Sequence, residues 1–241
     1  MLHAIVSDIH GNLEALEAVL ADLERLKPAS VACLGDFVGY GASPNECIDR
    51  LRPWLEVSVI GNHDLASIGR IRMGGFNSEA AEAARWTDRQ LTAELRAWLE
   101  ALPFTAVWRD ALLVHASPID PGDWNYVLSP ADAEAEMAAC QEPLVLIGHS
   151  HFPGAFELDN GRARYTRSEE IQMGARRRYL VNVGSVGQPR DGDPRAAYVL
   201  YDDRERTLKH VRLEYDFESA MNRIRAAGLP PFLAERLRWG E

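Results

Sequence analysis

The sequence predicts a layered α/β fold. Over the first 60 residues, short apolar strands alternate with amphipathic helices, a pattern typical of parallel strands joined by right-handed crossovers. The second half contains more strands, several of them joined by short turns. Because no internal repeat, low-complexity run or long linker interrupts the chain, we expect one domain over residues 1–241.

The N-terminal part is expected to form a βαβαβ unit followed by a helical insertion. Apolar residues recur every three or four positions from Asn12 to Leu26, which indicates a helix that Asn12 can cap. Pro44 suits the first turn of a second helix, which should end near Leu51. Strands are expected before Gly11 and over residues 31–34 and 56–60, and two helices over residues 65–101. In this insertion Trp86 and Trp98 have helical spacing, so we expect them in the core rather than in a cofactor platform.

The rest of the chain is expected to alternate strands with a few helices. The turns Arg109-Asp110 and Asn160-Gly161 each predict a hairpin. Strands are expected over residues 104–108, 111–114, 143–147, 155–158, 163–167, 179–183, 196–201 and 207–213. Helices are expected over residues 130–140 and from about residues 217 and 231 onward.

Composition and charge exclude several classes of protein. The chain has 36 acidic and 26 basic residues, and its net charge of -10 disfavours broad electrostatic binding to nucleic acid or anionic membranes. Its three cysteines have no paired spacing, which indicates reduced thiols. No signal peptide is recognisable and no apolar run is long enough to span a membrane. We therefore expect a soluble cytoplasmic protein with no membrane partner.

Side chains that can bind metals follow five of the expected strands. Singly, each has an ordinary structural explanation, since Asp and Asn often begin turns or helices and buried His is usually just hydrogen-bonded. However, the carboxyl ends of parallel strands share one edge of a sheet, so we expect the set to meet there. Asp8 and His10 should face the same way as alternate residues of an extended chain. The set comprises Asp8 and His10, Asp36, Asn62 and His63, His115, and His149 and His151. It holds too many ligands for one tetrahedral zinc ion and suits two divalent ions.

These motifs resemble those of the calcineurin-like metallophosphoesterase superfamily. The blocks Asp-x-His, Gly-Asp-x-x-Gly, Gly-Asn-His-Asp, a strand-end His and Gly-His-x-His occur in that order from Asp8 to His151. The segment Asn182–Arg190 extends the resemblance to the small bacterial and archaeal phosphodiesterase branch. The resemblance implies two packed mixed β-sheets flanked by helices, a four-layer αββα sandwich, which agrees with the layered α/β pattern.

The resemblance also implies a division of the ligands. Asp8, His10 and His151 would hold one metal; Asn62, His115 and His149 would hold the other; and Asp36 would bridge the two. A carboxylate has two oxygens with which to bridge, which supports Asp36 rather than Asn62 in that position. The mixed nitrogen and oxygen donors suit Mn²⁺ foremost, and also Fe, Ni²⁺ and Zn²⁺.

Residues around these ligands suggest further roles. His63 is the candidate to stabilise charge in the transition state or to protonate the leaving oxygen, with a plain structural hydrogen bond as the alternative. Gly39 and Tyr40 stand where related protein phosphatases carry a polar residue and an Arg, so a bidentate phosphate clamp is missing and a phosphoprotein substrate is disfavoured. In those phosphatases an Asp at the Gly39 position orients the catalytic His. Because this chain has no side chain there, the sequence does not identify a hydrogen-bond partner for His63. Arg190 is the candidate to contact phosphate instead, whereas the run Arg176–Arg178 could also do so but is more readily explained as a solvated charged face.

The sequence thus predicts a dinuclear metal-dependent phosphoesterase, a phosphodiesterase that hydrolyses a small phosphoester or nucleotide by attack of a metal-activated water. One alternative is a non-catalytic binding scaffold of the same fold, against which the presence of His63 argues. Another is a nuclease, against which the net charge argues. The expected partner is a small phosphoester and not nucleic acid. The sequence makes no prediction of the oligomeric state.

Overall fold

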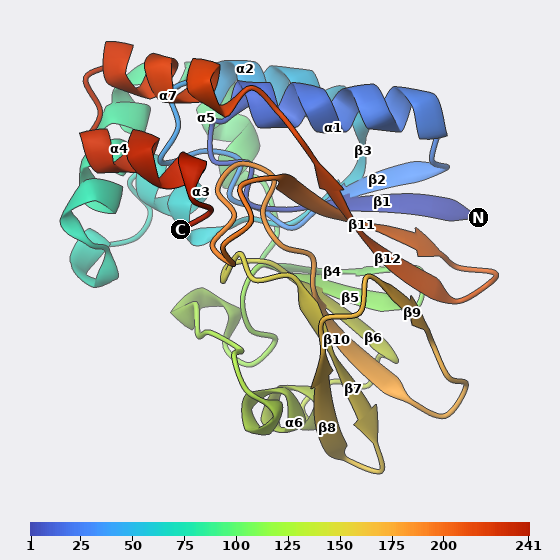
Figure 1. Ribbon diagram of the computed structural model, residues 1–241. Coiled ribbons are helices and arrows are strands. Elements are labelled where there is room, and N and C mark those ends of the chain that lie inside the picture. Colours follow the sequence, from blue (N-terminus) through green and yellow to red (C-terminus); the bar gives the residue numbers. More distant parts are fainter.

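The computed structural model describes residues 1–241 as two six-stranded sheets packed face to face (Figure 1). The first sheet has the order β3-β2-β1-β11-β12-β9, and the second has the order β4-β5-β6-β10-β7-β8. Strands β1, β2 and β3 are parallel to one another, as are β5, β6 and β10, whereas the other neighbours are antiparallel. Both sheets are therefore mixed, as the family resemblance implied.

The elements follow the expected order along the chain. The strands are β1 (Leu2–Val6), β2 (Ser30–Cys33), β3 (Leu55–Ser58), β4 (Thr105–Trp108), β5 (Ala111–Val114), β6 (Leu144–Ile147), β7 (Gly154–Asp159), β8 (Arg162–Thr166), β9 (Glu170–Gln172), β10 (Arg178–Asn182), β11 (Ala196–Asp202) and β12 (Thr207–Leu213). The helices are α1 (Leu13–Leu26), α2 (Pro44–Leu51), α3 (Asn62–Ser67), α4 (Ser78–Gln90), α5 (Ala93–Glu100), α6 (Pro130–Ala138), α7 (Phe217–Ala226) and α8 (Pro231–Glu235).

Because successive residues of a strand point to opposite faces, the strands supply apolar side chains to three regions of the core: one between the sheets, and one between each sheet and its helices. In β1, Ala4 and Val6 pack toward α1 and α2, whereas Ile5 points into the space between the sheets. In β6, Leu146 points into that same space, and its neighbours Val145 and Ile147 pack toward α6. Figure 1 shows the resulting order, with α1 and α2 above the first sheet and α6 below the second. The four-layer sandwich is thus confirmed.

Local signals explain where the first helices begin. Asn12 accepts a hydrogen bond from the backbone N–H of Ala15 and caps α1, and Pro44 opens α2 as expected. Two differences from the sequence prediction stand out. The insertion has three α-helices rather than two, since the short helix α3 begins at Asn62 itself. The edge strand β9 was not predicted, because three residues are too few to show an alternating pattern.

The two tryptophans of the insertion are half-buried against the core, as expected. Trp98 packs against the cluster beneath α1 and α2, and Trp86 against the cluster formed with the C-terminal helices. None of the helices is both long and apolar enough to cross a lipid bilayer.

Truncating the core between the sheets should destabilise the protein strongly. Leu146 is fully buried there, so Leu146→Ala should lower the free energy of unfolding by about 2–5 kcal/mol in urea denaturation. Val107 in β4 of the same sheet is 68% exposed, and Val107→Ala should change it by less than about 0.5 kcal/mol. Equal effects of the two substitutions would contradict the packing described.

Candidate metal centre

All the predicted metal ligands lie shortly after strands, at one edge of the two sheets. Asp8 and His10 follow β1, Asp36 follows β2, and Asn62 begins the helix after β3, all in the first sheet. His115 follows β5, and His149 and His151 follow β6, in the second sheet. The site therefore lies where the carboxyl ends of the parallel strands of both sheets meet, and each sheet contributes ligands to it.

Most of these ligands have a left-handed backbone conformation. The φ angles are 54° at Asp8 and Asp36, 49° at His10, 62° at His149 and 63° at His151. This region is uncommon for residues other than glycine, and such strain concentrates at functional sites. The predicted reason for the convergence of Asp8 and His10 is wrong, because β1 ends at Val6 and sharp turns, not strand alternation, bring the two side chains together.

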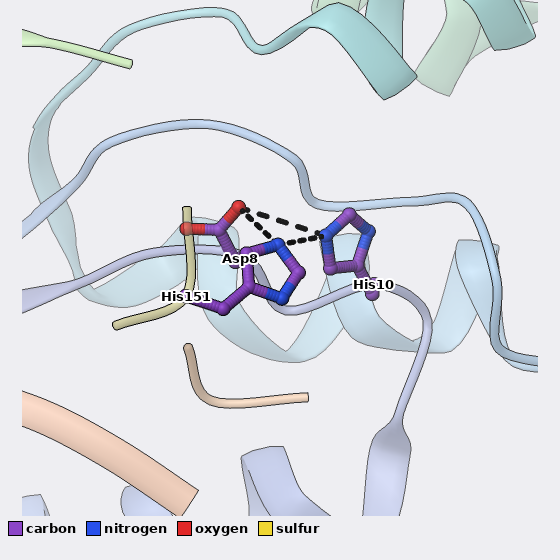
Figure 2. Close-up of side chains that lie close together, drawn as sticks. All are labelled: Asp8, His10 and His151. Atoms are coloured by element: carbon purple, nitrogen blue, oxygen red, sulfur yellow. Dashed lines mark hydrogen bonds and ion pairs between the residues drawn. The ribbon is translucent and has the colours of Figure 1, made fainter. Parts of the chain in front are cut away.

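Asp8, His10 and His151 form the first of two groups able to hold a metal ion (Figure 2). The Nε2 atoms of His10 and His151 are 3.1 Å apart, and Oδ1 of Asp8 lies 3.6 Å from the former and 3.1 Å from the latter. The three side chains come from both sheets, and all three are buried. Their donor atoms thus point at one small volume.

Asp36, His115 and His149 form the second group. Oδ2 of Asp36 is 3.3 Å from Nε2 of His115 and 3.6 Å from Nε2 of His10, so this carboxylate lies between the two groups. Gly61 allows this position, because a Cβ there would collide with Oδ1 of Asp36. Asn62 is buried in the adjacent turn, at the start of α3.

Backbone carbonyls set the tautomers of three histidines. Nδ1 of His10 lies 3.0 Å from the carbonyl oxygen of Val38, Nδ1 of His115 lies 2.8 Å from that of Leu34, and Nδ1 of His151 contacts that of Gln188. A carbonyl only accepts hydrogen bonds, so each Nδ1 carries the proton. In a neutral ring the lone pair is then on Nε2, which faces the site, as in metal-ligating histidines.

Five of the donor atoms that face the site have no hydrogen-bond partner in the protein, whereas Nε2 of His10 and Nε2 of His151 lie against each other. The five are Oδ1 of Asp8, Oδ2 of Asp36, Oδ1 of Asn62, and Nε2 of His115 and of His149. Buried polar atoms are almost always paired, because leaving one without a partner costs about 1–3 kcal/mol. Carboxylate, amide and imidazole donors around one point fit divalent transition metals, so the residues present match such ions.

The charges of the ligands are strongly coupled. Burial raises the pKa of Asp8 and of Asp36, but the facing histidines more than offset it, so both carboxyls have pKa values below the ordinary range. Burial lowers the pKa of His115, yet the charges of Asp36 and Asp8 raise it to about 9. Burial lowers the pKa of His149 to about 4 and that of His151 to about 3.

Asp64 supports the second group and was not singled out from the sequence. Its carboxylate accepts backbone hydrogen bonds from Asp36 at 2.8 Å, Gly61 at 3.1 Å and Val38 at 3.2 Å. It thereby ties the loop after β2 to the loop after β3. Asn182 acts similarly in the second sheet, donating to the carbonyl of Gly148 at 2.6 Å. Asp64 is the last residue of the Gly-Asn-His-Asp block, which was the available signal.

His63 lies beside the ligands without a side-chain partner. Its backbone N–H donates to Oδ1 of Asp36 at 2.8 Å, but its Nδ1 is buried and has no hydrogen bond. The ring packs 4.3 Å from the ring of Tyr40, measured between centroids. A Cβ on Gly39 would lie 2.6 Å from Nδ1, so Gly39 leaves room for the ring but offers no side chain to orient it. Burial lowers the pKa of His63 well below its ordinary value.

An open cleft of about 470 Å³ leads to the site. Asn62, His63, His149 and Arg190 line it. The cleft also includes aromatic side chains that the sequence analysis did not identify, namely Phe76, Trp124 and Tyr126, and the ring of Tyr126 stacks on that of His149 at 4.3 Å.

The other arginines considered for phosphate contact lie elsewhere. Arg178 begins β10 and donates to the backbone carbonyls of Met137, Cys140 and Glu142 at the end of α6. Its neighbour Arg177 pairs with Glu157. These residues precede or begin a strand whose opposite end faces the site, so the Arg176–Arg178 run lies away from the cleft.

Comparison with known proteins agrees with this arrangement. The family model of the calcineurin-like phosphoesterase superfamily domain matches residues 1–205. The uncharacterized protein MJ0912 of Methanocaldococcus jannaschii is 36% identical over 98% of this chain and 97% of its own. The chain belongs to the calcineurin-like phosphoesterase superfamily, which confirms the resemblance seen in its motifs.

Two solved structures share the fold over their whole length. The crystal structure of a metallophosphoesterase from Sphaerobacter thermophilus covers 100% of this chain and 99% of its own, at 39% identity and a TM-score of 0.89. The hypothetical protein PH1004 from Pyrococcus horikoshii OT3 covers 100% and 98%, at 22% identity and a TM-score of 0.81.

The pKa pattern predicts how metal affinity depends on pH. His115 is protonated at pH 7 and must lose that proton to present a lone pair, so binding of Mn²⁺ to the group of Asp36, His115 and His149 should release about one proton. Its affinity should rise about tenfold per pH unit from pH 7 to 9 and level off above. Calorimetric titration with Mn²⁺ at several pH values measures both quantities.

The His115→Asn variant is the control for this measurement. It should weaken binding at the second group and remove the steep pH dependence. His151 is already neutral in this range, so that ligand adds no such slope at the first group. Equal slopes at the two sites, or a slope that survives in His115→Asn, would contradict the assignment.

Proposed function

We propose that the protein is a dinuclear metal-dependent phosphoesterase that hydrolyses a small phosphodiester or nucleotide. The observation that carries the proposal is the set of buried donor atoms without partners, arranged in two adjacent groups at the end of an open cleft. The metallophosphoesterase from Sphaerobacter thermophilus, similar over its whole length, supports the same class of reaction.

We assign each group one ion. Asp8, His10 and His151 would hold the first, Asn62, His115 and His149 the second, and Asp36 would contact both. Two such ions, when bound, supply Lewis-acid stabilisation of the phosphoryl oxygens and a water of lowered pKa as nucleophile. Mn²⁺ is the ion we propose first, on the basis of the mixed nitrogen and oxygen donors.

The protein's own residues bind and orient the substrate in this proposal. Arg190 faces the cleft and offers its guanidinium to the phosphoryl group. The neutral ring of His63 can donate one N–H to a phosphoryl or leaving-group oxygen, and would have to gain a proton before it could give one up. The aromatic rings of Phe76, Trp124 and Tyr126 offer apolar surface to an aromatic leaving group or a nucleobase.

Hydrolysis of bis-p-nitrophenyl phosphate tests the proposal directly. We expect turnover with added Mn²⁺ and loss of turnover on chelation. We expect no detectable turnover in Asp36→Asn, because a neutral amide lacks the negative charge with which the carboxylate would hold two ions. Asp123→Asn, at an exposed position in the same cleft, is the control and should stay active. Absence of turnover on a broad phosphoester panel with both sites loaded would refute the enzymatic proposal, and a stoichiometric protein partner would then favour a scaffold.

Replacing His63 should separate catalysis from metal binding. We expect His63→Gln to lower kcat by about 10²–10⁴-fold, the usual range for a lost proton donor or hydrogen bond in the transition state. Metal content measured by elemental analysis should stay at two ions per chain, because the side chain of His63 is not among the predicted ligands. Loss of an ion in this variant would instead make His63 part of the metal site.

A further inference from the structure

The C-terminal segment contributes a side chain to the cleft. Helices α7 and α8 and the short helix after them (Arg236–Arg238) pack against α4 and against Tyr40 of the loop after β2. This segment lies beyond residue 205, where the match to the family model ends. Figure 1 shows it in red beside α4, next to the edge where the strands end. From it, Arg236 reaches the same cleft that Arg190 lines.

Arg190 has no carboxylate within 4.0 Å, and Arg236 contacts no side-chain carboxylate but does contact the last residue, Glu241. Arg190 contacts Oε1 of Gln188 through Nε and Nη2, and its Nη2 donates to the hydroxyl of Tyr40 at 3.1 Å. Arg236 uses Nε to contact the main-chain oxygen of Glu241, the last residue, whose negative charge partly offsets the lowering of the pKa of the guanidinium by burial. Nη1 of Arg190 and both Nη atoms of Arg236 are left without a partner.

Other arginines of the same segment are neutralised. Arg223 pairs with Glu14, Arg225 with Glu235, and Arg238 with Glu218. Arg190 is therefore an exception within its surroundings, and Arg236 is only partly neutralised, because its Nη atoms stay without a partner. Both are half-buried, and burial and the neighbouring Arg190 lower the pKa of Arg236 to about 10, which leaves it charged at neutral pH. Two half-buried cations that line one cleft and keep free Nη atoms favour an anion in that cleft.

Tyr40 separates this pair from the metal ligands. Its ring lies 4.3 Å from the ring of His63 and 4.6 Å from that of His10, while its hydroxyl contacts Arg190. Arg190 is thus about one aromatic ring away from the metal centre. When a phosphoester is bound at that centre, the free Nη atoms of the two arginines would remain available to a second anionic group on the same molecule.

We propose that Arg190 and Arg236 form a second anion subsite, which binds a phosphoryl or carboxylate group next to the phosphoester that is cleaved. This inference rests on the proposed function, since it specifies the substrate of the same site. The two arginines would take the role of the Arg that related phosphatases carry at the Tyr40 position. The subsite would restrict the substrates to small phosphoesters that carry a second anionic group. Arg236 is then a specificity-determining residue.

Binding of small phosphonates to the Mn²⁺-loaded full chain tests the subsite. Methylphosphonate has one anionic group, methylenediphosphonate has a second phosphoryl group, and phosphonoacetate has a carboxylate instead. In calorimetric titrations, Arg236→Gln should weaken binding of methylenediphosphonate, phosphonoacetate or both by about tenfold or more, as expected for losing a charged hydrogen bond. Methylphosphonate should change by less than about twofold. The ligand that weakens identifies the second group.

Two further variants control the interpretation. Arg236→Lys keeps the charge but not the planar fork, and should give an intermediate loss. Arg238→Gln, two residues away and paired at the surface, should leave all three affinities unchanged. Equal weakening of all three ligands by Arg236→Gln, or no weakening, would overturn the subsite. The titrations need no turnover, so a failure to hydrolyse phosphoesters would refute the proposed function without deciding this result.

Discussion

The structure is organised around buried polar atoms that the protein does not satisfy by itself. Carboxylate, amide and imidazole donors with no hydrogen-bond partner face one another at the joint edge of the sheets. Such an arrangement is unfavourable on its own, because it removes the groups from water without giving them hydrogen bonds within the protein. Much of the surrounding structure maintains it: carbonyls fix the imidazole tautomers, Asp64 and Asn182 tie the loops together, and glycines leave space for the carboxylates.

The strained backbone belongs to the same constraint. At Asp8, His10, Asp36, His149 and His151 a left-handed residue turns the chain after the strand, whereas His115, directly after β5, reaches the site without one. Such a conformation costs of order 1–3 kcal/mol per residue and persists only where the rest of the fold compels it. Asp and His tolerate this region better than most residues, so the chemistry of the ligands and the geometry of the turns require the same residue types.

Much of this arrangement could be predicted from the sequence, because its signals are local. The apolar runs located the strands, and the polar residues directly after them located the donors, from Asp8 to His151. What could not be predicted depends on contacts distant in sequence. The short strand β9 exists only through its pairing with β12, and Arg236 reaches the cleft only because the last helices pack on Tyr40. The contact of Arg178 with the end of α6 likewise depends on tertiary packing, and its place in a run of three arginines gives no sign of it.

Each group of ligands draws on both sheets. Asp8 and His10 belong to the first sheet and His151 to the second, while Asp36 belongs to the first and His115 and His149 to the second. An ion held by either group is therefore a cross-link between layers that otherwise adhere through apolar side chains. Because an ion that binds only the folded state adds to its stability, the supply of such an ion would also set the stability of the sandwich.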